Sequence, residues 1–162
     1  MSKSLIIYFS RADENYSVGY ISKGNTEYIA DFVRELTGAD MFKVEPEVPY
    51  AADYKTCIEE AKKRIGNAPI KEKLTDISDY DTIFVMSPIY WGTYAPEIET
   101  ALEGLDFTGK LIRVVSTHEG SGLASMPSDV KKMCKGAEVD MNGLAIVGSQ
   151  AKNSKQKVTE WV

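Results

Sequence analysis

The sequence predicts an α/β protein built on a doubly wound parallel sheet of five strands. Apolar runs of four to six residues alternate along the chain with amphipathic segments of helical length, which is typical of βα units that form a parallel sheet covered on both faces. The chain has 162 residues, of which 43% are hydrophobic and 27% charged, as in an ordinary globular protein. We therefore expect a single domain over residues 1–162.

Five apolar runs are the expected strands. They lie at 5–9, 41–44, 82–86 and 111–115, with the fifth somewhere within 138–147. The second run is the least hydrophobic of the five, so we place it at an edge of the sheet.

Apolar stripes between the runs predict the helices. Ile29, Phe32, Val33 and Leu36 follow the i, i+3, i+4, i+7 spacing of one helix face, and Gly38 is a suitable stop. Two further stripes are Tyr54, Ile58, Ala61 and Ile65, and Ile98, Ala101, Leu102 and Leu105. Ser125 before Pro127 is a capped helix start that leads to Val130 and Met133, and Val158 with Trp161 indicates a short last helix. We interpret all these stripes as core packing.

Charge and composition exclude several classes of protein. The net charge of −5 disfavours binding to nucleic acid or to anionic membranes and suits docking on basic partners. No apolar run approaches the roughly 20 residues of a membrane helix. The two cysteines, Cys57 and Cys134, form no Cys-x-x-Cys pair, so we expect no metal site and a reduced, cytoplasmic setting.

Ligands of such sheets bind beyond the carboxyl ends of the strands, so the segments after the first, third and fourth strands are the candidate site. After the first strand come Ser10 and Arg11, then twelve residues, then Gly24, Asn25 and Thr26 at the start of a helix. Small hydroxyl residues, a glycine and a helix N-terminus suit a phosphate group. The alternative is a simple helix cap. The intervening segment 12–23 is too long for a typical βα connection, and we expect it to be functional.

The segment after the third strand, residues 87–96, holds three aromatic residues and two prolines. Exposed aromatic rings at a turn need a cover, and a flat conjugated ring would provide one. The alternative is a loop folded onto its own domain or into a dimer contact. The segment after the fourth strand, residues 116–122, holds two glycines among small polar residues, which lets backbone groups approach the polar edge of a planar ligand. Alone it could be an ordinary turn. Together the three segments describe a ligand with a phosphate, a stackable ring and a polar ring edge.

At these residues the chain resembles the flavodoxin-like family, in particular bacterial members with Tyr-Phe-Ser-Arg at the first strand and Pro-Ile-Tyr-Trp-Gly after the third. The resemblance implies the strand order 2-1-3-4-5 and a non-covalently bound FMN. By motif, the phosphate loop comprises Ser10, Arg11, Gly24, Asn25 and Thr26. The isoalloxazine is flanked by Ser87, Pro88, Ile89, Tyr90, Trp91 and Gly92, with Tyr90 or Trp91 stacked on it. Its pyrimidine edge meets Thr117, His118, Glu119, Gly120, Ser121 and Gly122. The twelve-residue interruption of the phosphate loop departs from flavodoxins in the narrow sense.

The expected function is that of a low-potential electron carrier between redox proteins whose docking surfaces are basic. Glu119 is the candidate for disfavouring negative charge on the reduced flavin, the alternative being a solvated carboxylate. A second function is an NAD(P)H-dependent oxidoreductase acting on quinones or similar small acceptors. The chain has no Gly-x-Gly-x-x-Gly fingerprint for a dinucleotide, which favours the carrier. A non-redox signalling domain is disfavoured because it needs an acidic cluster at the strand ends.

Overall fold

Five parallel strands form the sheet in the computed structural model, which describes residues 3–15 and 19–162. The strand order is β4-β1-β5-β7-β8, with bounds Ser4–Tyr8 for β1, Asp40–Lys43 for β4, Thr82–Tyr90 for β5, Leu111–His118 for β7 and Glu138–Val147 for β8. Numbered along the chain, these strands follow the order 2-1-3-4-5. The predicted doubly wound sheet and the edge position of its second strand are confirmed.

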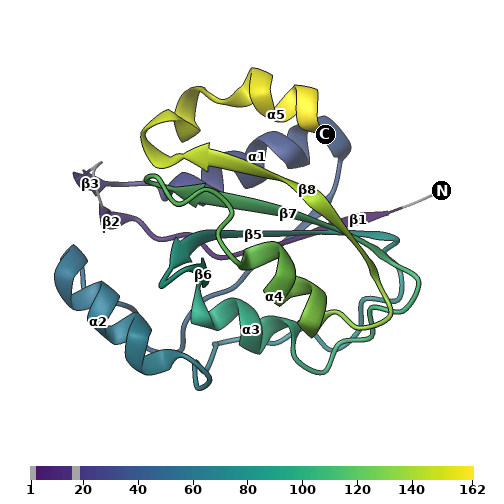
Figure 1. Ribbon diagram of the computed structural model, residues 1–162, viewed down its shortest axis with the longest axis horizontal. Helices are drawn as coiled ribbons and strands as arrows, with labels where there is room; N and C mark the ends of the chain where they lie inside the picture. The colour runs from purple at the N-terminus through teal and green to yellow at the C-terminus, as the bar shows by residue number, and fades with distance from the viewer. Residues whose placement is uncertain (1–2, 16–18) are drawn as a thin grey trace.

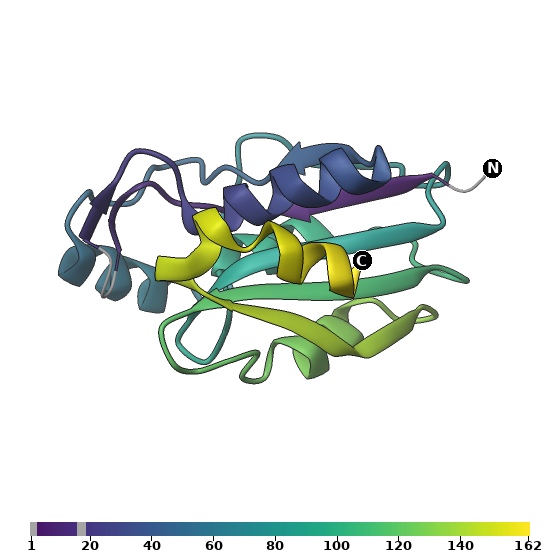
Figure 2. The ribbon, with the colours of Figure 1, turned by 90° about the horizontal axis from the view of Figure 1, so that it is seen from above.

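Helices cover both faces of this sheet (Figure 1). One face carries α1 (Asn25–Thr37), the 3-10 helix η1 (Gly148–Asn153) and α5 (Lys155–Trp161), and Figure 2 shows α1 and α5 side by side. The other face carries α3 (Pro96–Leu102) and α4 (Met126–Met133). In both views α2 (Tyr54–Arg64) stands beyond the carboxyl ends of the strands. No helix in the described ranges is long and apolar enough to cross a membrane.

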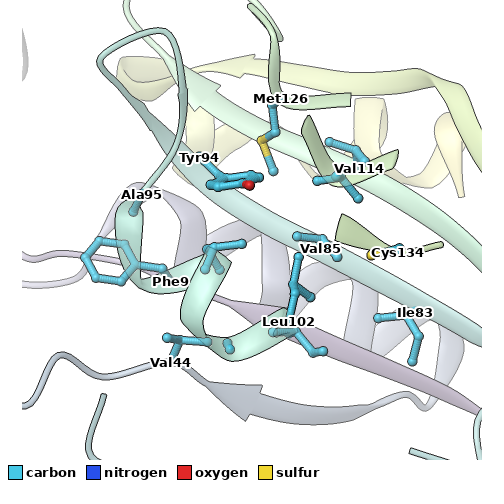
Figure 3. Packing of buried hydrophobic residues seen from close by; sticks show 14 of the residues in the cluster. Phe9, Val44, Ile83, Val85, Tyr94, Ala95, Leu102, Val114, Met126 and Cys134 are labelled. Carbon is cyan, nitrogen blue, oxygen red and sulfur yellow. The ribbon is translucent and has the colours of Figure 1, made fainter. Parts of the chain in front are cut away.

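Alternation along β1 divides the core into two clusters. Leu5, Ile7 and Phe9 face one side of the sheet, where they pack with residues of α3 and α4, and Ile6 and Tyr8 face the side covered by α1 and α5. Figure 3 shows the first cluster, with side chains from the sheet and from both helices in mutual contact. Because both faces of the central strands are buried, those strands are largely apolar, which is why the sequence pattern identified them. The edge strands β4 and β8 include polar, exposed residues.

The observed helix ends and buried helix faces agree in part with those predicted from the sequence. Gly38 ends α1 with φ of +72°, and its N–H donates to the Arg34 carbonyl at 2.8 Å, as a left-handed cap does. Ser125 precedes α4 as predicted, but its hydroxyl donates to the Gly92 carbonyl and to Asp129 and does not cap the helix. The core stripe predicted for α2 is correct at Ala61, which is buried, and wrong at Ile65, which is 57% exposed and lies beyond the helix. In α1 the predicted stripe is wrong only at Leu36, which is exposed.

The segment after the third strand is a hairpin, so the prediction of a loop there is wrong for its first residues. Ser87 and Pro88 continue β5, because they still pair with β7. After Tyr90 the chain turns through Trp91 and Gly92 into β6 (Thr93–Tyr94), which pairs antiparallel with β5. Both turn residues have positive φ, +54° and +84°, as a type I′ hairpin turn requires.

A second hairpin lies within the 12–23 segment. It pairs β2 (Asp13–Asn15) with β3 (Gly19–Ile21), and the sequence did not predict it. Each strand is only three residues long, and β2 is entirely polar, so the pair lacks the apolar pattern by which the strands of the main sheet were found.

Candidate functional site

A cavity of about 320 Å³ opens at the carboxyl ends of the central strands. All three predicted segments contribute to its wall. The lining residues are Asn25 from the first segment; Pro88, Ile89, Tyr90 and Trp91 from the second; Thr117, His118, Glu119 and Ser121 from the third; and Asn15, Tyr54 and Ile58 from elsewhere. The structure therefore brings together the predicted segments, which are widely separated in the sequence.

The start of α1 is shaped by a close contact between two predicted residues. The hydroxyl oxygen of Ser10 accepts the N–H of Glu27 at 3.0 Å, which satisfies one of the first amides of the helix. A Cβ on Gly24 would lie 2.0 Å from that oxygen and 2.8 Å from the Arg11 nitrogen, so only glycine fits. Because the cap residue Gly24 has no side chain, it leaves the other amides of the first turn without a capping group, as binding of an anion requires.

Thr26 links the first segment to the third. Its side chain is buried, and its hydroxyl lies 2.8 Å from the hydroxyl of Thr117. Either oxygen can donate, so one hydroxyl hydrogen of the pair has no acceptor within the pair itself. This pair holds the end of β7 against the first turn of α1.

Arg11 is engaged with backbone carbonyls. Its guanidinium donates to the carbonyls of Ala51 and Ala52, each at 2.7 Å, and to that of Glu14. The side chain is buried and does not line the cavity. It fastens the β2–β3 hairpin to the segment that precedes α2. A contact between Arg11 and a phosphate stays a prediction from the motif.

Tyr90 belongs to an aromatic cluster beside the cavity. Its ring packs edge-to-face on Phe9 and Tyr50, with centroid distances of 5.8 and 6.1 Å. Its hydroxyl is buried without a hydrogen-bond partner among the described residues, and burial raises the pKa of Tyr90 well above its usual value. The cluster fixes this ring in the inner wall.

Trp91 reaches toward α2. Its indole N–H donates to the Ile58 carbonyl at 2.7 Å, and the Lys62 ammonium lies 5.1 Å from the ring centroid. The side chain is 50% exposed. Stacking of Tyr90 or Trp91 on a ligand stays a prediction, but the structure shows what anchors each ring.

The third segment places two titratable groups at the cavity. The Nδ1 atom of His118 accepts the N–H of Gly120 at 2.9 Å, and burial, with a smaller contribution from Lys157, lowers the pKa of His118. Burial raises the pKa of Glu119, against the opposing effect of the Gly148 and Ser149 amides. Glu119 is thus partly withdrawn from solvent, unlike the solvated carboxylate of the alternative interpretation.

Several predicted residues do not line the cavity. Those outside the lining are Ser10, Arg11, Gly24, Thr26, Ser87, Gly92, Gly120 and Gly122. Ser87 is an example: its hydroxyl accepts the Ala95 N–H and donates to the Pro88 carbonyl, both at 2.8 Å, and so braces the β5–β6 hairpin.

Sequence reasoning missed three lining residues. Tyr54 and Ile58 were interpreted as core because their spacing is the same for a buried face and for a cavity wall. Asn15 lies in the 12–23 segment, whose unusual length was the available signal. Among the described residues, no cluster of His, Cys, Asp or Glu could hold a metal ion.

Comparisons with known proteins agree with this fold. The fold is similar to a protein from Bacteroides uniformis (TM-score 0.76, 22% identity, covering 99% of this chain and 97% of that one). It is also similar to a flavoprotein in complex with FMN from Lactobacillus acidophilus (TM-score 0.65, 22% identity, 94% and 98% covered). A flavodoxin from Fusobacterium nucleatum bound to flavin mononucleotide gives a TM-score of 0.53 at 16% identity, with 98% and 94% covered. No curated protein matches the chain. The flavodoxin family model matches residues 15–162, and the chain therefore belongs to the flavodoxin family.

Proposed function

We propose that the chain binds one FMN non-covalently and carries electrons at low potential between redox proteins. The observation that carries the proposal is the cavity at the carboxyl ends of the strands, whose wall is built from all three predicted segments. Two structurally similar proteins hold FMN, the one from Lactobacillus acidophilus and the flavodoxin from Fusobacterium nucleatum.

The residues present fit the two ends of FMN. The first turn of α1, with Gly24 in a position that excludes any side chain, would hold the phosphate. Asn25 lies where this turn meets the cavity, so it would lie between the phosphate and the ring. The apolar wall of Pro88, Ile89 and Tyr90 would receive the ring, and the polar residues 117–121 its pyrimidine edge. When bound, FMN supplies the reversible electron transfer, and the chain supplies binding and orientation.

The charge of the protein sets the class of partner. The net charge of −5 favours redox proteins whose docking surfaces are basic, through long-range attraction that salt weakens. Glu119, partly withdrawn from solvent beside the cavity, would oppose negative charge on a reduced flavin and so keep the potential low. Cys57 and Cys134 are free and buried, which fits the cytoplasmic setting that we propose.

Identification of the released cofactor and stopped-flow reduction test the proposal. The denatured holoprotein should release FMN, and release of FAD or of no flavin would contradict FMN binding. NADH or NADPH alone should reduce the protein slowly, and a reductase or dithionite quickly, because the proposed site holds one nucleotide. Reduction by NAD(P)H within seconds, with turnover of a quinone, would contradict the carrier and make the chain an oxidoreductase.

A further inference from the structure

Helix α2 forms a wall of the cavity although it stands apart from the main sheet. Its residues Tyr54 and Ile58 line the cavity, one helical turn apart on the same face. Only Cys57 and Ala61 of this helix are buried. Apolar burial of α2 is therefore limited to these two members of the core cluster, and polar contacts add to what holds the helix in place.

Polar contacts hold both ends of α2. At the start, the Asp53 carboxylate accepts the Thr56 N–H at 2.9 Å, and Glu14 of the β2–β3 hairpin accepts the Tyr54 N–H at 2.6 Å. At the other end, Arg64 forms an ion pair of 3.3 Å with the fully buried Glu97 of α3. The ends are thus tied to two different elements.

The middle of α2 is tied to the β5–β6 hairpin by Trp91, whose indole N–H donates to the Ile58 carbonyl at 2.7 Å. Trp91 occupies a turn position with φ of +54°, which is unfavourable for a bulky side chain. Asparagine or glycine would satisfy this turn at lower cost. A strained tryptophan whose only hydrogen bond to the described chain reaches α2 indicates a constraint beyond the turn itself.

We propose that Tyr54 contacts the isoalloxazine ring and that Trp91 is a positioning residue which holds Tyr54 there. The inference rests on the proposed binding of FMN. The three predicted segments surround a ring from the side of the sheet, and α2 supplies an aromatic and an aliphatic side chain on the remaining side. A tyrosine ring offers a large flat contact at a small cost in conformational entropy.

Replacement of Tyr54 by leucine tests the ring contact. The apoprotein is titrated with FMN and with riboflavin, which lacks the phosphate, and the emission of the bound flavin is measured. We expect Tyr54→Leu to weaken the binding of both ligands equally, by about 3- to 10-fold, because one aromatic pair is lost. The emission of the bound flavin should increase. The matched control is Tyr20→Leu, because Tyr20 is 69% exposed and does not line the cavity.

Replacement of Trp91 by phenylalanine tests the positioning role, because it keeps an aromatic ring and removes the N–H. In the apoprotein, hydrogen exchange of the α2 amides should become about 5-fold faster, which corresponds to the loss of one hydrogen bond. The affinities for FMN and for riboflavin should again fall by equal factors. Trp161→Phe is the control, because the Trp161 indole donates to the Asn142 carbonyl at 3.1 Å, away from α2.

The outcomes separate this inference from the proposed function. If the wild-type protein binds FMN and Tyr54→Leu changes neither affinity nor emission, the ring contact is wrong and the proposed function stands. If Tyr54→Leu lowers the affinity for FMN much more than the affinity for riboflavin, Tyr54 acts at the phosphate and the inference is likewise wrong. Unchanged exchange of α2 in Trp91→Phe refutes the positioning role. If the wild-type protein binds no flavin, the proposed function and the ring contact fail together, and the exchange result still decides the role of Trp91.

Discussion

Removal of the Tyr50 hydroxyl should destabilise the protein more than removal of any exposed tyrosine hydroxyl. Tyr50 donates to both carboxylate oxygens of Glu97, at 2.8 and 3.1 Å, and Arg64 stacks on the Tyr50 ring while it pairs with the same carboxylate. Glu97 is fully buried. A carboxylate in such a position depends on each of its donors, because water cannot replace one that is lost.

The expected magnitude follows from this geometry. Tyr50→Phe keeps the ring and leaves Arg64 in place, so the change removes one hydrogen bond to a charged group and opens no large cavity. Such a bond contributes about 1.5–3 kcal/mol to the free energy of unfolding. At about 2–4 °C per kcal/mol for a chain of this size, the melting temperature should fall by about 3–12 °C.

A similar tyrosine–carboxylate hydrogen bond at the surface serves as the control. Tyr80 donates to Asp40 at 2.6 Å, and Lys3 lies over the Tyr80 ring and 3.8 Å from the same carboxylate. The hydrogen bond to Asp40 raises the pKa of Tyr80 to about 12, so its hydroxyl is also protonated at neutral pH. Because water can replace a partner at this surface, Tyr80→Phe should cost less than about 1 kcal/mol.

Urea unfolding of the apoprotein at pH 7, followed by circular dichroism, measures both losses. A cycle with Glu97→Gln separates the pairwise contribution, which should exceed about 1 kcal/mol for residues in direct contact. Equal losses for Tyr50→Phe and Tyr80→Phe, or a loss below about 0.5 kcal/mol for Tyr50→Phe, would refute the argument that burial makes this hydroxyl important.

Three further changes test the site. Thr26→Val should weaken FMN binding by about 10- to 100-fold and riboflavin binding far less, since it removes a hydroxyl at the phosphate end. The control is Thr100→Val, which should change neither affinity, because the Thr100 hydroxyl donates to the Ala68 carbonyl far from the cavity. Equal weakening of both ligands by Thr26→Val would identify Thr26 as structural only. Gly24→Ala should lower the free energy of unfolding by about 1–3 kcal/mol and weaken FMN, because the new Cβ would meet the Ser10 oxygen; unchanged urea midpoints would contradict this. Because the pKa of His118 is lowered from its ordinary 6.5, its contribution to the free energy of unfolding is complete above pH 6.5 and is lost as the pH falls through the folded-state pKa. His118→Asn should therefore lose less stability than the wild type between pH 7.5 and 5. The same pH dependence of the free energy of unfolding in both proteins would exclude this assignment.

The sheet could be predicted because its signal is local. Each strand buried on both faces is an apolar run, and the connections between runs are helical, so strand order followed once the family resemblance was known. The β2–β3 hairpin could not be predicted in this way. Its strands are three residues long, and the guanidinium of Arg11 fastens it to carbonyls forty residues away, a contact without any local pattern.

The candidate site was predictable by segment and less so by residue. Strand ends meet at one edge of the sheet, so the three segments had to converge there, and the structure shows that they do. Which side chains line the cavity depends on packing: Ser87 turned inward to brace a hairpin, and Thr26 paired with Thr117. Tyr54 and Ile58 were missed because α2 leaves the sheet, and helical periodicity does not tell what a face contacts.

The end of β8 bears on how sequence changes among related chains can be interpreted. The backbone of Gly148 lies so close to two cavity residues that a Cβ there would come within 2.2 Å of a Glu119 oxygen and 2.5 Å of the Asn25 side-chain nitrogen. Any larger residue at this position must displace both of them at once. Glycine at position 148, far along the chain from the recognisable motifs, is therefore what lets these two side chains occupy their present positions at the cavity. A related chain that carries a side chain there, even with its phosphate loop intact, should hold the ends of these two side chains in different positions at the cavity wall.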